Sequence, residues 1–336
     1  MKRFVCIFSV FACNAAIGDT GLLTAQIERA KYACVGISDE MSDLKTMAGI
    51  NTAVTAVGTV AGGVALGTGL AKANVDAVAD EIEAELQKEL DKLNRLAAQQ
   101  TDFDFIPDFD VPDDDVSQLT VDFAYNDYAA PDSAFTIQQG VVNEKQSELD
   151  KLTKKSKSLG NIRTGTLAGA AVADTAGTII AANNRVKGDL QSQIDECIAA
   201  TKELAAIRMQ ERINGTADTA ELDIADNIVR ECGAWETIDL SKINKRATGA
   251  AISAGTGAAL AIAGTITSAS ANSNSVRSDD TESGKKKEKN LNTASNVLAG
   301  GTTAASAVAT VFNATQISTI KRAAQTADKC EEAFNQ

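Results

Sequence analysis

The chain holds only three prolines in 336 residues, and all three lie between positions 107 and 131. Proline removes a backbone donor and clashes with the preceding helical turn, whereas alanine is the best helix former. Outside this window apolar residues recur at three- and four-residue steps, as in Ile82, Leu86, Leu90 and Leu93. The sequence therefore predicts an all-α protein built from long, uninterrupted helices.

The first residues have the features of an export signal. Lys2 and Arg3 precede a short apolar run over residues 4–12, and small residues follow up to Gly18. This pattern predicts a signal peptide over residues 1–18 and a protein that is periplasmic, cell-surface or secreted. Two alternatives stay open: a lipoprotein signal with Cys13 as the lipidated residue, and an uncleaved helix that packs on the core.

Charge and composition argue against two functional classes. The formal net charge is −13 and the sequence pI is about 4.6, so the surface repels nucleic acid. Histidine is absent, which removes the commonest general base and metal ligand. No glycine-rich stretch has the spacing of a phosphate-binding loop. We expect a protein that is not an enzyme and that has neither cofactor nor nucleic-acid partner.

Four cysteines beyond the signal bracket the Gly/Ala-rich parts of the chain. These Gly/Ala-rich segments cover residues 49–71, 161–184, 247–271 and 290–314. Cys34 precedes the first and Cys197 follows the second, and Cys232 and Cys330 bracket the last two in the same way. The order predicts a tandem duplication of one antiparallel helical hairpin, with the hairpins over 19–218 and 219–336.

Each hairpin would bring its two cysteines to the same open end. The sequence therefore predicts two disulfides, Cys34–Cys197 and Cys232–Cys330, as is usual for an even number of cysteines in an exported protein. The alternative is that some of these cysteines are free thiols in a helical core.

Small residues four apart give the Gly/Ala-rich segments a flat face along each helix, which lets two backbones approach closely. The segments are predicted to pack through these faces as a bundle, and the amphipathic stretches 72–100 and 141–160 to extend the first hairpin as a coiled-coil stalk. The glycines expected in the helix contacts are Gly58, Gly62, Gly63, Gly67, Gly165, Gly169, Gly177, Gly257 and Gly264.

The Gly/Ala-rich segments fit either water or a bilayer. The uncharged runs 46–71, 247–276 and 290–320 are long enough to cross the hydrocarbon layer. Their many Thr, Ser and Asn residues, and Asp174 within the second segment, are costly there. The composition favours a bundle in water, and membrane association stays the second interpretation.

An acidic, aromatic insert interrupts the first hairpin at residues 101–140. It has ten aspartates, seven aromatic residues and no Lys or Arg. Such a segment predicts a partner-binding tip, with folding back onto the hairpin or a solvated linker as alternatives. The partner-binding residues are predicted to be Phe103, Phe105, Phe109, Tyr125 and Tyr128. Residues 102–115 could attract calcium, but they lack the spacing and the glycine of a calcium loop, so we predict no metal site.

These observations predict an exported structural or interaction protein. It would self-associate as a homo-oligomer, or dock another protein, through its small-residue helix faces and the acidic aromatic tip. The alternative is a membrane-active protein that oligomerises through the Gly/Ala-rich helices into a pore.

Overall fold

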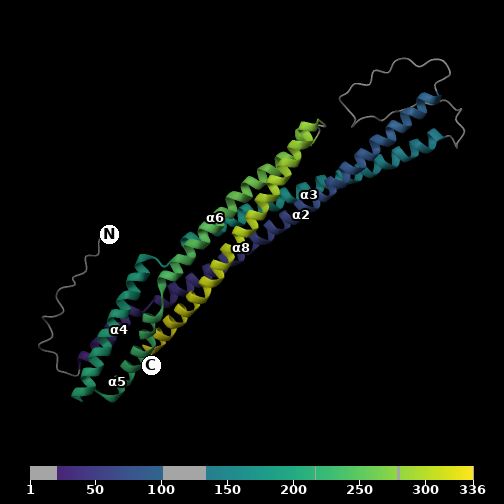
Figure 1. Ribbon diagram of the computed structural model, residues 1–336. Coiled ribbons are helices and arrows are strands. Elements are labelled where there is room, and N and C mark those ends of the chain that lie inside the picture. Colours follow the sequence, from purple (N-terminus) through teal and green to yellow (C-terminus); the bar gives the residue numbers. More distant parts are fainter. Residues whose placement is uncertain (1–20, 101–133, 216, 278–280, 336) are drawn as a thin grey trace. The chain divides into compact units, whose positions relative to one another are not determined.

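A computed structural model describes residues 21–100, 134–215, 217–277 and 281–335 (Figure 1). Over these ranges the chain is helical, with short turns between helices. The helices are α1 (Leu22–Cys34), α2 (Ile37–Gln100), α3 (Ala134–Asn183), α4 (Gly188–Asn214), α5 (Thr219–Cys232), the 3₁₀ helix η3 (Gly233–Thr237), α6 (Leu240–Ala271), α7 (Asn274–Arg277) and α8 (Glu282–Ala333). The predicted all-α class is confirmed for this part of the chain.

Local sequence accounts for several of the helix ends. Gly36 has φ of +89° and separates α1 from α2, and Gly215 has φ of +66° after the last residue of α4. Glycine adopts this left-handed conformation without steric cost, which makes it the usual helix terminator. Asp218 precedes α5, and its side chain accepts a hydrogen bond from the N–H of Ala220.

The chain forms two compact units, and α2, α3, α6 and α8 contribute residues to both. Unit 1 comprises residues 1–64, 165–266 and 297–336, and unit 2 comprises residues 65–164 and 267–296. Each unit therefore draws on both predicted hairpins.

In unit 1 the long helices pack as an antiparallel four-helix bundle. Contacts between α2 and α3 pair residue 58 with 174 and residue 55 with 177, so the two helices run in opposite directions. Contacts between α6 and α8 pair residue 249 with 312 and residue 260 with 301, again antiparallel. A hydrogen bond donated by α2 to α8 and another donated by α8 to α3 join the two hairpins.

Unit 2 contains the remainder of the long helices. Its part of α2 and its part of α3 are joined by side-chain hydrogen bonds from Gln138 to Glu89, from Lys145 to Glu85 and from Ser156 to Asp76. The two helices therefore run antiparallel here too, with Ile82 and Leu86 buried. Helix α3 begins at Ala134, within the stretch assigned to the insert. The predicted partner-binding residues, Phe103 to Tyr128, lie outside the described residues.

Candidate functional site

Both predicted disulfides, Cys34–Cys197 and Cys232–Cys330, are present in unit 1. They link α1 to α4 and α5 to α8, across sequence separations of 163 and 98 residues. The Sγ atoms of Cys34, Cys232 and Cys330 lie within 4.8 Å of one another, so the two bonds are neighbours. Metal ions bind the thiolate form of cysteine, and sulfurs joined in disulfides do not provide it.

Around the disulfides lies a helical head with a conventional apolar core. We use "head" for α1, α4, α5, η3 and the adjoining ends of α2, α6 and α8. Its fully buried side chains include Ile37, Met41, Ile194, Ile228 and Trp235. These large side chains form an apolar core of the kind found in a protein that folds in water.

The four-helix bundle of unit 1 has the opposite kind of interior. Its buried positions carry small residues such as Ala170, Ala254 and Ala309, together with polar side chains that are fully buried. Asn51 on α2 donates to Asn313 Oδ1 on α8 at 2.8 Å, and Asn313 donates back to Thr55 Oγ1 at 3.2 Å. The centre of the bundle is therefore held by hydrogen bonds and close backbone approach.

Asp174 is the one carboxylate in the four Gly/Ala-rich segments, and it lies inside the bundle with no exposed surface. Its Oδ2 accepts a 2.6 Å hydrogen bond from Ser306 Oγ on α8, while Oδ1 has no hydrogen-bond partner among the described residues. A Cβ atom on Gly58 or Gly257 would come within 2.5 Å of the carboxylate oxygens. Glycine at these two positions leaves the space that Asp174 occupies.

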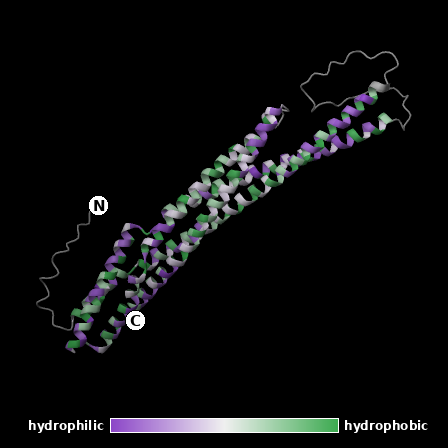
Figure 2. Cartoon of the chain, viewed as in Figure 1, coloured by the Kyte–Doolittle hydropathy of each residue, from purple (hydrophilic) through white to green (hydrophobic). Residues whose placement is uncertain are grey.

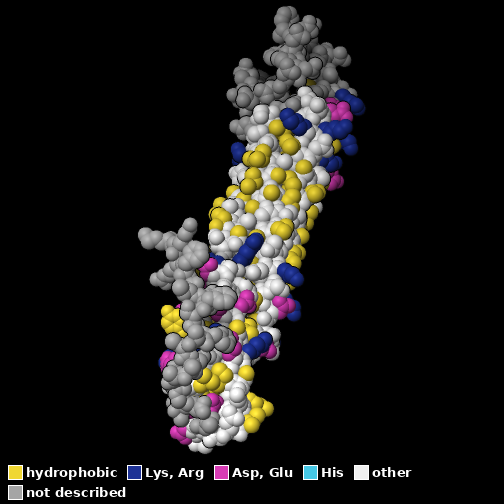
Figure 3. Space-filling model, turned by 90° about the vertical axis from the view of Figure 1, so that its left-hand side faces the viewer, with side chains coloured by type: hydrophobic (Ala, Val, Ile, Leu, Met, Phe, Trp, Pro, Cys, Tyr) yellow, Lys and Arg dark blue, Asp and Glu magenta, His cyan; other side chains and the backbone are white. Residues whose placement is uncertain are grey.

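The outer surface of the same bundle is apolar. Exposed fractions are 60% for Val57 on α2, 72% for Val172 on α3, 65% for Ile252 on α6 and 62% for Val311 on α8. The other exposed aliphatic residues of the bundle are Ile50, Val60, Val64, Ile179, Ile262, Ile266, Val297 and Val308. On the face drawn in Figure 3, hydrophobic side chains gather in a band that has neither basic nor acidic side chains within it.

The hydroxyl groups on this outer surface are bonded to the helices themselves. The exposed threonines of the unit 1 bundle each donate to the backbone oxygen four residues earlier, at 2.7–3.1 Å. They are Thr46, Thr175, Thr256 and Thr315. A hydroxyl bonded in this way does not need water.

Within unit 1 each helix of the bundle has an uncharged stretch of about 20 residues, over 46–64, 247–266 and 297–320. On α3 the stretch 165–184 is interrupted only by the buried Asp174. Twenty helical residues are about 30 Å long, which matches the hydrocarbon thickness of a bilayer. Helices α2, α3, α6 and α8 are long and apolar enough to cross a membrane, and Figure 2 shows the apolar and intermediate residues along them.

The structure places five of the nine predicted contact glycines in close contacts. A Cβ on Gly58, Gly62, Gly177, Gly257 or Gly264 would lie within 3.3 Å of atoms of a neighbouring helix. The prediction does not hold for the other four, since a Cβ on Gly63, Gly67, Gly165 or Gly169 would meet no described atom within 4 Å. These four glycines are exposed. Successive residues of a helix point about 100° apart, so a small residue next to a contact position in the sequence can lie on the outward side of the helix.

Four close glycine contacts were missing from the sequence prediction. In unit 1 they involve Gly249 with Phe312 and Gly301 with Leu260. In unit 2 a Cβ on Gly69 or Gly160 would overlap an asparagine side chain, Asn296 or Asn272 respectively. The four-residue glycine spacing that guided the prediction does not include them, and the identity of the opposing side chain is visible only in the fold.

Unit 2 contains two buried cations in addition to its buried apolar residues. Lys72 has no exposed side-chain surface, and its Nζ forms ion pairs with Asp76 at 2.5 Å and Glu288 at 3.2 Å. Arg163 is equally buried and donates to Ser268 Oγ, Asn296 Oδ1 and Asn292 Oδ1 at 2.7–3.0 Å. Buried charges require such partners, so both side chains have structural roles here.

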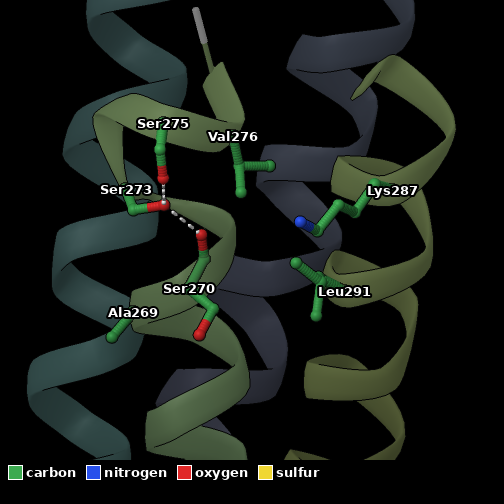
Figure 4. A pocket seen from close by; sticks show the side chains of 7 residues that line it. All are labelled: Ala269, Ser270, Ser273, Ser275, Val276, Lys287 and Leu291. Carbon is green, nitrogen blue, oxygen red and sulfur yellow. Dashed lines mark hydrogen bonds between the residues drawn. The ribbon is translucent and has the colours of Figure 1, made fainter. Parts of the chain in front are cut away.

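A shallow hollow in unit 2 has little to hold a ligand. It is lined by Ala269, Ser270, Ser273, Ser275, Val276, Lys287 and Leu291 (Figure 4). Ser273 Oγ donates to the Ser270 backbone oxygen at 2.7 Å and lies 3.2 Å from Ser275 Oγ, so these hydroxyls bond to one another.

Comparisons with protein families, curated proteins and solved structures gave no match.

Proposed function

We propose that the chain is an exported structural protein of a membrane, in which α2, α3, α6 and α8 cross the bilayer as a four-helix bundle and the disulfide-linked head lies on the extracytoplasmic side. The observation that carries the proposal is the contrast between the two interiors of unit 1. The core of the head is built from large aliphatic side chains, whereas the bundle buries small residues with Asn, Ser, Thr and Asp and has many of its large aliphatic side chains on its outer surface.

Water and lipid stabilise opposite arrangements of apolar and polar side chains on a helix bundle. Each exposed aliphatic side chain costs about 1.5–3 kcal/mol in water relative to burial, and monomeric soluble proteins rarely expose large contiguous apolar patches. In a bilayer the same side chains contact acyl chains, while small residues and buried polar groups drive helix association.

The composition favoured a bundle in water because of its threonines and Asp174. Both objections weaken once their positions are known. The exposed threonines bond to their own helices, and Asp174 is enclosed by α2, α6 and α8, where lipid does not reach it. Intramembrane carboxylates generally face the bundle interior in this way.

The disulfides support the assigned side of the membrane. Disulfides form and persist in oxidising compartments, so the head belongs outside the cytoplasm.

Lipid contact can be tested by tryptophan quenching, because the native chain has a single tryptophan, which is buried in the head. Val57→Trp and Val308→Trp would place a second indole on the outer surface of the bundle. In vesicles with brominated acyl chains, we expect the emission of the added tryptophan to be quenched strongly and that of Trp235 to be retained.

The matched control is Ile213→Trp, at an exposed apolar position of the head. Equal and weak quenching at positions 57, 308 and 213 would contradict a membrane-crossing bundle and return the chain to the soluble, self-associating interpretation.

A further inference from the structure

A group of basic residues lies at the boundary between the head and the bundle of unit 1. We call it the basic belt, and it consists of Lys45, Arg185, Lys187, Lys245, Arg246 and Lys321. The belt residues lie on α2, α6 and α8 and in the turn that follows α3.

Hydrogen bonds place these residues at one level of the bundle. Val186 N–H donates to Asn244 Oδ1 at 2.8 Å, which aligns the turn after α3 with α6. Gln316 Nε2 on α8 donates to the Asn184 backbone oxygen at 3.0 Å. The side chain of Asn184 also lies 3.1 Å from the Leu44 backbone oxygen, next to Lys45 on α2.

The belt is a concentration of positive charge without acidic partners. None of its six side chains takes part in an ion pair with another described residue, although Lys242 nearby is paired with Asp239 at 3.5 Å. Arg246 is held in place by neutral acceptors, with Nη1 donating to the Thr315 backbone oxygen and to Thr319 Oγ1, both at 2.6 Å. The acidic residues nearest to the belt in sequence are Asp43 and Asp189, which are fewer than the basic ones.

The apolar outer surface begins next to the belt. Met47 and Ile50 follow Lys45 on α2 with exposed fractions of 40% and 47%, and Ile252 follows Arg246 with 65%. A ring of unpaired cations beside an apolar surface is complementary to the headgroup layer of a membrane that contains anionic lipid.

We infer that the basic belt binds the headgroups of anionic phospholipids at the extracytoplasmic face of the bilayer. The inference rests on the proposed function and deepens it, because it names the lipid class and the residues that select it. The phosphate oxygens of the lipids would accept the hydrogen bonds that the lysine and arginine side chains do not make within the chain.

The test compares lipid responses of two quadruple variants of the full chain purified in detergent micelles. The belt variant is Lys45→Gln, Lys187→Gln, Lys245→Gln and Lys321→Gln. The control variant removes the same charge from exposed lysines of α3 in unit 2, at Lys151, Lys154, Lys155 and Lys157. Thermal unfolding is followed by the fluorescence of Trp235 during titration with phosphatidylglycerol or phosphatidylcholine.

We expect phosphatidylglycerol to raise the melting temperature of the native chain and of the control variant more than phosphatidylcholine does. The belt variant should lose this difference, and each single substitution should raise the half-effect concentration up to about fivefold, the factor for about 1 kcal/mol per basic residue. Equal losses in both quadruple variants, or an undiminished response in the belt variant, would overturn the inference.

Two further measurements distinguish lipid binding by the belt from binding of free phosphate and from a loss of membrane insertion. Inorganic phosphate at the same concentration should not reproduce the effect, and a full reproduction would remove the assignment to lipid. Insertion of the belt variant into phosphatidylcholine vesicles, measured with Val57→Trp, should be unchanged. If the native chain inserts but its melting temperature does not respond to phosphatidylglycerol, only the assignment of lipid binding to the belt is refuted. If the native chain fails to insert, the proposed function is refuted.

Discussion

At the scale of single residues, the same residue type has opposite roles on two sides of one bundle. Gly62 on α2 faces α8, and a Cβ there would lie 2.8 Å from Thr303 Oγ1 and 3.2 Å from the Thr303 backbone nitrogen. Gly169 on α3 faces outward with no described atom within 4 Å. Sequence spacing assigned both to a helix contact, because small residues at four-residue intervals mark a stripe without saying which of two adjacent stripes is inside.

We therefore expect Gly62→Leu and Gly169→Leu to differ in sign. Leucine at position 62 has to displace the backbone of α8, and overpacking of this kind costs about 1–3 kcal/mol or more. Leucine at position 169 has open space and improves helix propensity by roughly 0.8 kcal/mol. Melting temperatures of the purified variants test this directly. Destabilisation of similar size at both positions would mean that Gly169 also contacts a neighbour.

At the scale of the elements, the sequence was sufficient to predict the long helices and the two disulfide pairs. The long helices follow from the confinement of proline, and the disulfide partners follow from the order of cysteines and Gly/Ala-rich segments. The start of α3 at Ala134 was not predicted, because the aromatic-containing, uncharged stretch of the insert continues past it. The duplication itself stays a prediction.

The start of α6 gives an element-scale prediction about pH. Asp239 directly precedes α6. The hydrogen bond that Ser241 Oγ donates to its carboxylate lowers the pKa of this carboxyl most, and hydrogen bonds from Lys242 lower it further. A carboxyl with a lowered pKa in the folded state stabilises the fold above its unfolded pKa of about 3.9, and this contribution is lost as pH falls through the folded value. We expect Asp239→Asn to reduce the loss of melting temperature between pH 5 and pH 2.

The control for this measurement is Asp223→Asn, on the exposed face of α5. Its acid sensitivity should match that of the native chain. If Asp239→Asn lost as much melting temperature between pH 5 and pH 2 as the native chain does, the stabilisation at the start of α6 would not depend on the charge of Asp239.

At the scale of the whole molecule, the sequence could not decide between water and lipid, and the reason is physical. In the Gly/Ala-rich segments neither face of a helix is clearly polar, so the hydrophobic pattern does not identify the inward side. The decision depends on where a few residues lie: Val57 and Ile252 are exposed, and Asn51 and Asp174 are buried. These positions become known only when four helices from distant parts of the sequence are packed together.

A single charged substitution on the outer surface separates the two environments. Ile252 is 65% exposed and lies in the uncharged stretch 247–266 of α6. A lysine at an exposed position of a soluble protein changes stability by no more than about 0.5 kcal/mol. A lysine in a membrane-crossing helix costs up to about 2.5–3.5 kcal/mol on insertion scales, the full value applying at the helix centre and a smaller one nearer its ends.

We therefore expect Ile252→Lys to lower the fraction of protein recovered in the membrane of an expressing cell and to destabilise the vesicle-inserted protein. Ile213→Lys, at a 76% exposed position of the head, adds the same charge and should leave both quantities unchanged. Because the two changes are identical in chemistry, only the surroundings of the side chain distinguish them. If Ile252→Lys were as well tolerated as Ile213→Lys, the outer surface of the bundle at this position would face water, and the membrane-crossing arrangement would be contradicted.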